Sequence, residues 1–464
     1  MNILVINGSP KGENSITLHT CLFLEKKFPG HTFHYLHAGK QIKALEKDFR
    51  PALDALAAAE LVIFCYPVYT FLVPSQLHRF IELMKSSGAD LSGKAATQVT
   101  TSKHFYDITA HRFIEDNCAD MALPFLEGLS ADMDDILTDK GQKQAVDWLE
   151  FTLWKLSRKE FKRPAGCNEI PGQARDDEKG ARDDEKGARG MATVPQAVPH
   201  DKSRNAVIVT DLLPDDAALK AMTDRFTAVF PYACDVINIR DFLFMGGCQS
   251  CFNCAATGKC IYKDGFDDFL RNTIHRHDAI LYAFRIQDHS MGSRFKMYDD
   301  RQFCNGHRTV TMGTPFGYLV AGDYSREENL RLLLEARAQV GGNFLAGVAT
   351  DEGDVDRDID TLAATVAYAM EKQYTPPQNF YGVGGMKIFR DLIYLMRGLM
   401  RADHKFFKSH GQYDFPQKKW KTSWKMYPVG WLMRSPALKR KIGSRMTEGM
   451  IAPYKKILQQ TDTR

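Results

Sequence analysis

The chain has 464 residues, of which 44% are hydrophobic and 25% are charged, and its net charge is +4. These proportions are typical of a folded protein with substantial apolar cores, and the length predicts two or three domains. No apolar run is long enough to cross a bilayer, which argues against a transmembrane helix. The amino terminus, MNILVINGSP, has no basic region and soon turns polar, so it indicates a strand and not a signal peptide.

Residues 1–165 show the pattern of a parallel α/β domain. The apolar run NILVI predicts a first strand, and a polar turn leads into a predicted helix over 15–28. A strand over 60–69, a helix over 74–87 and a strand over 94–102 follow. Short apolar strands that alternate with amphipathic helices predict a sheet with helices on both faces.

The first strand and helix are joined by NGSPKGENSIT, residues 7–17. This position is the crevice at the carboxyl end of a parallel sheet, where doubly wound folds bind ligands. Gly8 and Gly12 permit close backbone approach, and the start of the helix attracts an anionic phosphate. The other candidate phosphate-binding residues are Ser9, Lys11, Asn14, Ser15 and Thr17. The alternative is an ordinary capped turn.

Residues 166–204 differ in composition from what precedes them. ARDDEKG occurs at 174–180 and again at 181–187, and the surrounding stretch has charged residues, Pro and Gly without apolar periodicity. This pattern predicts a disordered, solvated linker that carries no chemistry.

Residues 205–375 repeat the α/β alternation. Strands are predicted over 205–211, 234–242, 278–286 and 315–323, and helices over 216–230 and 293–304. The predicted fold class is therefore α/β, with two doubly wound parallel-sheet domains in tandem that are related by duplication.

Four cysteines of the second half lie close together, in the spacing Cys-x2-Cys-x2-Cys-x5-Cys: Cys248, Cys251, Cys254 and Cys260. Structural zinc sites usually separate two ligand pairs by a dozen or more residues, whereas successive close cysteines wrap one compact iron–sulfur body. The other cysteines are scattered, and without a secretory signal a reducing cytoplasm is expected, so disulfides are the least expected use. Zinc and free thiols remain alternatives.

Residues 376–464 form a basic, aromatic extension. Residues 381–464 hold 18 Lys or Arg against 5 Asp or Glu, whereas the first 380 residues hold 43 basic and 52 acidic residues. The pattern predicts helices, including one over 386–410. Such a segment could make peripheral contact with an anionic membrane. The alternative is that its helices pack on the two domains with their basic faces in solvent.

The first half resembles the NADPH-dependent FMN reductase and iron–sulfur flavoprotein superfamily, which has a flavodoxin-like fold. GSPKGENSIT resembles its phosphate loop, and 66–82 and 100–116 resemble its flavin-side loops. The resemblance implies that Ser9, Lys11, Asn14 and Ser15 hold the FMN phosphate. The residues that it places near the flavin ring are Pro67, Val68, Tyr69, Thr101, Ser102 and His104. We assign no catalytic side chain, because a flavin itself carries the electron chemistry.

The second half resembles the same superfamily but departs from it at the flavin loops. CQSCFNCAATGKCIYKDGFDDF is similar to the cysteine motif of the iron–sulfur flavoproteins, which implies a [4Fe–4S] cluster. The phosphate loop has become TDLLPDDAALK, where Asp211, Asp215 and Asp216 would repel a phosphate. Residues 285–287, Arg-Ile-Gln, stand in place of Pro-Val-Tyr. We therefore predict that this half has lost FMN.

The resulting hypothesis is a cytoplasmic NAD(P)H-dependent flavin oxidoreductase, with FMN in the first domain and a [4Fe–4S] cluster in the second. The expected redox partners are NAD(P)H, a quinone or a ferredoxin-like carrier. The resemblance implies a homo-oligomer, and no nucleic-acid partner is expected. One alternative is a non-enzymatic electron carrier of the flavodoxin or ferredoxin kind. Another is an FMN or quinone reductase whose second domain is held by zinc.

Overall fold

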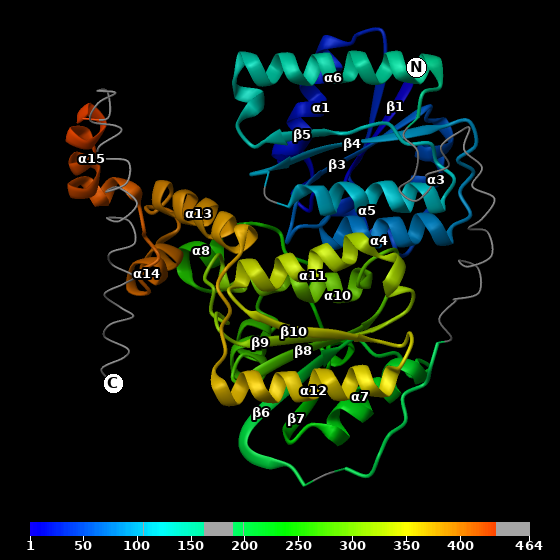
Figure 1. Ribbon diagram of the computed structural model, residues 1–464. Helices are drawn as coiled ribbons and strands as arrows, with labels where there is room; N and C mark the ends of the chain where they lie inside the picture. Colours follow the sequence, from blue (N-terminus) through cyan, green and yellow to red (C-terminus); the bar gives the residue numbers. More distant parts are fainter. Residues whose placement is uncertain (105, 162–188, 198, 433–464) are drawn as a thin grey trace, which may run out of the picture. The chain divides into compact units, whose positions relative to one another are not determined.

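The computed structural model describes residues 1–104, 106–161, 189–197 and 199–432. Residues 1–405 form one compact unit, and the chain from 406 onward forms a second unit. The first unit contains two five-stranded parallel sheets with helices on both faces of each (Figure 1).

The sheet of the first domain has the order β2-β1-β3-β4-β5. Its strands are β1 (Asn2–Asn7), β2 (Thr32–Leu36), β3 (Leu61–Pro67), β4 (Ala95–Ser102) and β5 (Leu129–Asp132). The helices are α1 (Ile16–Lys27), α2 (Ala38–Leu45), α3 (Arg50–Ala58), α4 (Ser75–Ser86), α5 (Asp107–Asp120) and α6 (Asp139–Arg158). The central strands β1 and β3 are continuous apolar runs because helices cover them on both sides.

The sheet of the second domain has the order β10-β9-β8-β6-β7. Its strands are β6 (Asp201–Thr210), β7 (Tyr232–Asn238), β8 (Ala279–Arg285), β9 (Pro315–Ala321) and β10 (Phe344–Thr350). The helices are α7 (Ala217–Val229), α8 (Asn253–Thr257), α9 (Phe266–Phe269), α10 (Gly292–Arg301), α11 (Glu328–Gly341) and α12 (Val355–Lys372). Counted within each domain, both sheets have the flavodoxin-like order 2-1-3-4-5, so the predicted fold class is confirmed.

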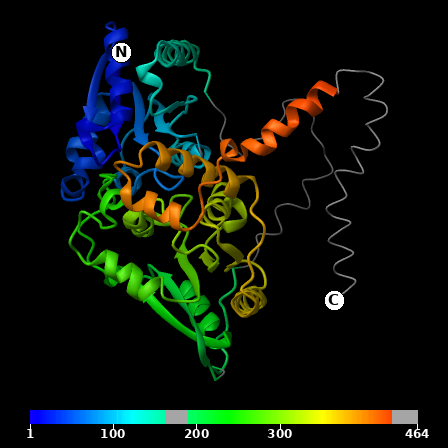
Figure 2. The same ribbon diagram turned by 90° about the vertical axis from the view of Figure 1, so that its left-hand side faces the viewer.

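The two domains meet through equivalent helices. Helix α4 packs against α10, and α5 packs against α11, so these four helices form a layer between the two sheets (Figure 1). In the turned view the blue first domain and the green second domain keep to opposite sides of that layer (Figure 2). One apolar cluster runs through the layer and includes Phe80 and Phe113 of the first domain and Phe295 and Leu333 of the second. The domains therefore share a core.

The outer faces of the sheets have separate cores. Leu18, Leu24 and Leu149, from α1 and α6, pack on the outer face of the first sheet. Phe226 and Val366, from α7 and α12, pack on the outer face of the second. Each sheet is thus covered by an apolar core on its outer face as well as on its inner face.

The end of the predicted linker is fixed on the second domain. Arg189 forms an ion pair with Asp323, the Thr193 N–H donates to Asp356 Oδ1 at 2.9 Å, and Ala192 is buried. Strand β6 begins at residue 201, before the expected domain boundary at 205. Arg189, Ala192 and Thr193 thus contact the second domain, where the sequence predicts a solvated linker. The ARDDEKG repeats lie outside the described residues.

The carboxyl-terminal extension is helical where it is described. Helix α13 (Phe380–Leu395) packs on α11, as the packing alternative predicts, and α14 (Arg401–Ser409) follows. The predicted helix over 386–410 is interrupted between these two helices, around Gly398. No helix in the described part of the chain combines the length and apolar character needed to cross a membrane.

Helix α15 (Trp420–Leu432) belongs to the second unit and carries an aromatic stripe. Trp420, Trp424, Tyr427 and Trp431 are exposed and recur at the spacing that puts residues on one side of a helix.

His289 connects the two domains electrostatically. Its Nδ1 lies 2.9 Å from Glu327 Oε1, and its Nε2 lies 3.0 Å from Asp120 Oδ2 of the other domain. The hydrogen bond to Glu327, with the charges of Glu327, Asp120 and Asp116, raises the pKa of His289 to about 9. The ion pairs therefore stabilise the fold fully below the unfolded-state pKa of about 6.5, and this contribution is lost as the pH rises through about 9.

We expect the free energy of unfolding to fall by about 1–3 kcal/mol between pH 6 and about pH 9.5 because His289 loses its proton. Urea unfolding followed by tryptophan fluorescence measures this change. The His289→Gln variant should show a smaller fall over the same range, and equal falls in the two proteins would contradict the assignment.

Candidate functional site

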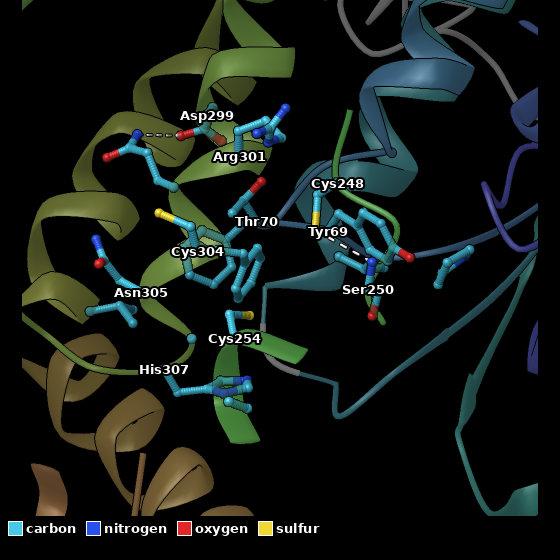
Figure 3. Close-up of a pocket in the computed structure, with 18 of the residues that line it drawn as sticks. Tyr69, Thr70, Cys248, Ser250, Cys254, Asp299, Arg301, Cys304, Asn305 and His307 are labelled. Carbon is cyan, nitrogen blue, oxygen red and sulfur yellow. Dashed lines mark hydrogen bonds between the residues drawn. The ribbon is translucent and has the colours of Figure 1, made fainter. Parts of the chain in front are cut away.

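A cavity of about 460 Å³ lies where the two domains meet (Figure 3). Tyr69 and Thr70 of the first domain and Cys248 and Cys254 of the second point into the same space. The loops that follow β1, β3 and β4 form one side, because the carboxyl ends of parallel strands meet at one edge of a sheet. The sequence-predicted residues that line the cavity are Ser9, Lys11, Ser15, Thr17, Pro67, Val68, Tyr69, Thr101, Ser102, Cys248, Cys251, Cys254 and Cys260.

The phosphate loop is closed by its own hydrogen bonds. The Asn7 side chain donates to the Gly12 carbonyl at 2.8 Å and accepts from the Ser9 N–H at 3.1 Å. Ser9 Oγ accepts from the Lys11 N–H at 3.3 Å. Gly12 has a φ of +57°, a left-handed conformation that glycine adopts without steric cost.

Ser15 leaves an unpaired polar group at the start of α1. It is the residue before the helix, yet its hydroxyl makes no capping bond, and it is buried without a hydrogen-bond partner among the described residues. Lys11 lines the same cavity. An unpaired buried hydroxyl, the free N–H groups of a helix start and a cation together suit a phosphate dianion. The residues present therefore fit the phosphate of FMN.

The loop after β3 contains a tight turn at residues 69–72. The Tyr69 N–H donates to the Leu72 carbonyl at 2.8 Å, and the Leu72 N–H donates to the Tyr69 carbonyl at 3.0 Å. Thr70 and Phe71 have φ values of 44° and 64°, so two consecutive non-glycine residues are left-handed. Burial raises the pKa of Tyr69, which is therefore neutral at physiological pH.

The cysteine segment packs closely against the first domain. A Cβ atom added at Gly247 would lie 2.5 Å from Ser75 Oγ at the start of α4, so any other residue there would displace that side chain. Gln76 Nε2 donates to the Cys248 carbonyl at 3.4 Å. Lys11 Nζ lies 5.7 Å from the centre of the Phe252 ring, a cation–π distance. The cysteine segment thus closes over the phosphate loop.

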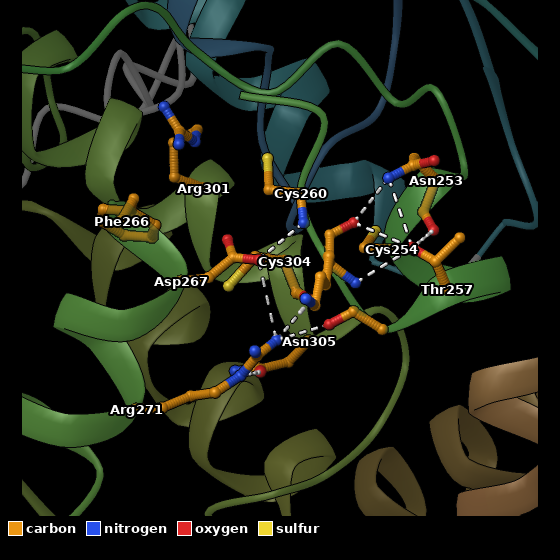
Figure 4. Close-up of polar contacts among 12 residues, drawn as sticks. Asn253, Cys254, Thr257, Cys260, Phe266, Asp267, Arg271, Arg301, Cys304 and Asn305 are labelled. Atoms are coloured by element: carbon orange, nitrogen blue, oxygen red, sulfur yellow. Dashed lines mark hydrogen bonds and ion pairs between the residues drawn. The ribbon is translucent and has the colours of Figure 1, made fainter. Parts of the chain in front are cut away.

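Hydrogen bonds from nearby side chains hold the shape of the cysteine segment (Figure 4). The Cys260 N–H donates to Asp267 Oδ2 at 2.7 Å, and Arg271 Nη2 donates to the Gly258 carbonyl at 2.7 Å. Asn253 Nδ2 donates to the Lys259 carbonyl at 2.9 Å. These bonds explain why an Asp-Asp pair follows the cysteines, since Asp267 fixes the backbone of the last of them.

The four clustered cysteines do not form a closed group of sulfur atoms. Among the described residues, no three cysteine sulfur atoms lie within 4.8 Å of one another.

The environment of two of the thiols, Cys248 and Cys254, favours their neutral form. Burial raises the pKa of Cys248 to about 12 and that of Cys254 to about 11. A metal or cluster would have to displace these protons on binding.

Two predicted residues do not line the cavity. Asn14 ends a short 3-10 turn (Gly12–Asn14) and is exposed to solvent. His104 is also exposed, and its Nδ1 lies 3.2 Å from both Asp107 Oδ2 and Ser130 Oγ. The binding roles expected for these two residues therefore stay predictions.

The inner part of the cavity comes from segments that sequence reasoning did not identify. These residues are Arg301, Cys304, His307 and Phe389. Phe389 belongs to α13, far along the chain from the other three, so no local signal could have brought it to them.

The equivalent phosphate position of the second domain is filled by an ion pair. Asp216 caps α7 by accepting the Leu219 N–H at 3.1 Å, and it also accepts Arg285 Nε at 2.7 Å. Arg285 ends β8 as Pro67 ends β3. No residue of 210–217 lines the cavity. A capped helix start with a carboxylate at its centre cannot receive a phosphate.

Gly39 of α2 allows a test of the phosphate loop. A Cβ atom there would lie 2.3 Å from the Gly8 carbonyl oxygen, so Gly39→Ala must displace the loop. We expect FMN to bind about tenfold more weakly or worse, since overpacking costs about 1–3 kcal/mol. FMN fluorescence titration measures the affinity. The control is Gly30→Ala, where an added Cβ meets nothing within 4 Å, and a similar loss there would contradict the prediction.

Comparisons with known proteins agree with this site. Residues 1–111 match the family model described as NADPH-dependent FMN reductase. An iron-sulfur flavoprotein of Archaeoglobus fulgidus is 28% identical over 173 residues, which are 35% of this chain and 78% of that protein.

Parts of the chain are also similar to solved structures. An FMN-dependent NADH-azoreductase from Bacillus anthracis is 11% identical, with 34% of this chain and 100% of that one covered and a TM-score of 0.27. The Trp repressor binding protein from Bacillus subtilis is 21% identical, with 32% and 97% covered and a TM-score of 0.26. The first domain is thus similar to the NADPH-dependent FMN reductase family, and the chain is similar to an iron-sulfur flavoprotein.

Proposed function

We propose that the protein is an FMN-dependent oxidoreductase in which electrons pass between FMN in the first domain and a [4Fe–4S] cluster in the second. The observation that carries this proposal is a single cavity lined by the flavin loops and by all four clustered cysteines of the same chain. Electron exchange needs two centres held close together, and the tight packing of Gly247 on α4 supplies that proximity.

The residues of the chain would bind and orient the two groups. When bound, FMN supplies two-electron chemistry and the cluster supplies one-electron chemistry. Lys11, Ser15 and the start of α1 would hold the phosphate. The turn at 69–72 and the loop at 101–102 would contact the ring. Cys248, Cys251, Cys254 and Cys260, which line the same cavity, would ligate the cluster.

One FMN per chain follows from the difference between the two halves. The first domain has an unpaired hydroxyl and a cation at its phosphate position, whereas the second has the Asp216–Arg285 ion pair there. NAD(P)H is the proposed electron donor, supported by the description of the matching family.

The cofactor content tests this proposal first. Protein purified without oxygen should hold one FMN and four iron atoms per chain, by flavin absorbance and metal analysis. Cys254→Ser should lose most of the iron and keep the FMN, because the phosphate loop is untouched. The control is Cys234→Ser on β7, which does not line the cavity and should keep both groups. Stoichiometric zinc, or two FMN per chain, would refute the proposal.

Turnover separates an enzyme from an electron carrier. We expect the protein to oxidise NADH or NADPH anaerobically in the presence of a one-electron dye. Cys254→Ser should still let the nicotinamide bleach the flavin but should reduce the dye about tenfold more slowly or worse, because the one-electron relay is lost. A simple carrier would show no turnover until a separate reductase is added.

A further inference from the structure

Two side chains of the second domain hold the turn at 69–72 of the first domain. Lys296 and Asp300 lie one helical turn apart on α10, form an ion pair and have no exposed side-chain surface. Lys296 Nζ donates to the Tyr69 carbonyl at 3.1 Å and to Thr70 Oγ1 at 2.6 Å. Asp300 accepts from Thr70 Oγ1 and from the Ser75 N–H, each at 2.8 Å. One buried ion pair therefore fixes both the turn and the start of α4.

This turn needs support from outside itself. Thr70 and Phe71 are both left-handed, and Thr70 is β-branched, so each conformation costs about 1–3 kcal/mol unless the surroundings impose it. The bonds from Lys296 and Asp300 reach the carbonyl before the first left-handed residue and the side chain of that residue itself. Removing them would let the turn relax toward ordinary dihedral angles.

The second domain contains an equivalent turn at residues 287–290. The Gln287 N–H donates to the Ser290 carbonyl at 2.9 Å, and the Ser290 N–H donates to the Gln287 carbonyl at 3.0 Å. Asp288 and His289 are left-handed, as Thr70 and Phe71 are. The two turns therefore have the same backbone, and each lies against the helix of the other domain.

The helix contacts of the second turn are partly equivalent to those of the first. Glu82 of α4 accepts a hydrogen bond from the Ser293 N–H at 2.8 Å. In the same way, Asp300 of α10 accepts a hydrogen bond from the Ser75 N–H. One turn earlier on α4 stands His78, as Lys296 stands one turn before Asp300.

Of the cations that contact the two turns, Lys296 at the turn beside the FMN cavity has no exposed side-chain surface, whereas Lys85 and His289 at the other turn are partly exposed. His78 is fully buried, and its ring nitrogens have no hydrogen-bond partner among the described residues. Burial lowers the pKa of His78 to about 3, so it is neutral. Asp288 Oδ2 lies 3.8 Å from His78 Nε2, and Asp288 Oδ1 forms an ion pair at 2.9 Å with Lys85, a partly exposed side chain. The fully buried cationic contact thus acts on the turn that lines the cavity.

We infer that Lys296 and Asp300 are positioning residues of the flavin site, which impose the shape of the turn at 69–72 from the other domain. This inference rests on the proposed function, since it presupposes FMN at that turn. If the inference holds, the affinity of the first domain for flavin depends on helix α10 of the second domain.

The test compares matched variants on the two sides of the domain contact. Lys296→Met with Asp300→Asn removes the contact at the FMN turn without leaving an unpaired charge. His78→Met with Glu82→Gln removes the equivalent residues at the other turn. We expect the first pair to weaken FMN binding about tenfold or more and to change the visible circular dichroism of bound FMN. The second pair should leave the dissociation constant within about twofold of wild type.

A single substitution in the first domain covers the case in which the paired variant does not fold. Thr70→Val removes the hydroxyl that binds both Lys296 and Asp300 and keeps the side-chain shape. A hydrogen bond to a charged group contributes about 1.5–3 kcal/mol. We therefore expect the loss of this hydroxyl to weaken FMN binding about threefold or more. Unchanged affinity in this variant would overturn the inference.

The remaining outcomes are distinguishable. If the two paired variants weaken FMN binding equally, the cause is a loss of domain packing. This result would overturn the inference and leave the proposed function intact. Wild-type protein that binds no FMN would instead refute the proposed function, and the inference with it.

Discussion

The packing of α4 against α10 is the contact on which the cavity depends. Each helix covers apolar surface of the other, and each also reaches the turn that precedes its partner. The Lys296–Asp300 pair can be fully buried because its charges neutralise each other and bind Thr70 and the start of α4. Without this contact neither side of the cavity has its observed shape, since the cysteine segment is seated on α4 as well.

The two domains have one topology but different chemistry at the same edge of the sheet. In the first, the start of α1 follows a glycine-containing loop with an unpaired Ser15 hydroxyl. In the second, Asp216 occupies the start of α7 and is neutralised by Arg285. A single carboxylate at the start of a helix is enough to remove the preference of that helix start for binding an anion. The carboxylate already neutralises the positive end of the helix dipole. The second domain instead contributes its cysteines to the space beside the first.

Much of the fold could be predicted because its signals are local. The central strands are uninterrupted apolar runs, as at Leu61–Pro67, and the ligand loops follow them directly. Edge strands were harder to find, since Thr32–Leu36 alternates in burial and Phe344–Thr350 is only partly buried. A strand covered on one side carries no continuous apolar run. The positions of Asn14 and His104 outside the cavity have a similar cause, because a motif position does not specify the direction in which a turn presents its side chain.

The sequence by itself determined the two α/β units, the phosphate loop, the cysteine spacing and the loss of that loop's chemistry in the second half. Each of these depends on residues within about one loop or helix of one another. Only the tertiary structure decided that the four cysteines share a cavity with the flavin loops and that Lys296 reaches Thr70. Contacts between residues separated by 226 positions depend on how two amphipathic helices pack, and many packings satisfy the same hydrophobic pattern.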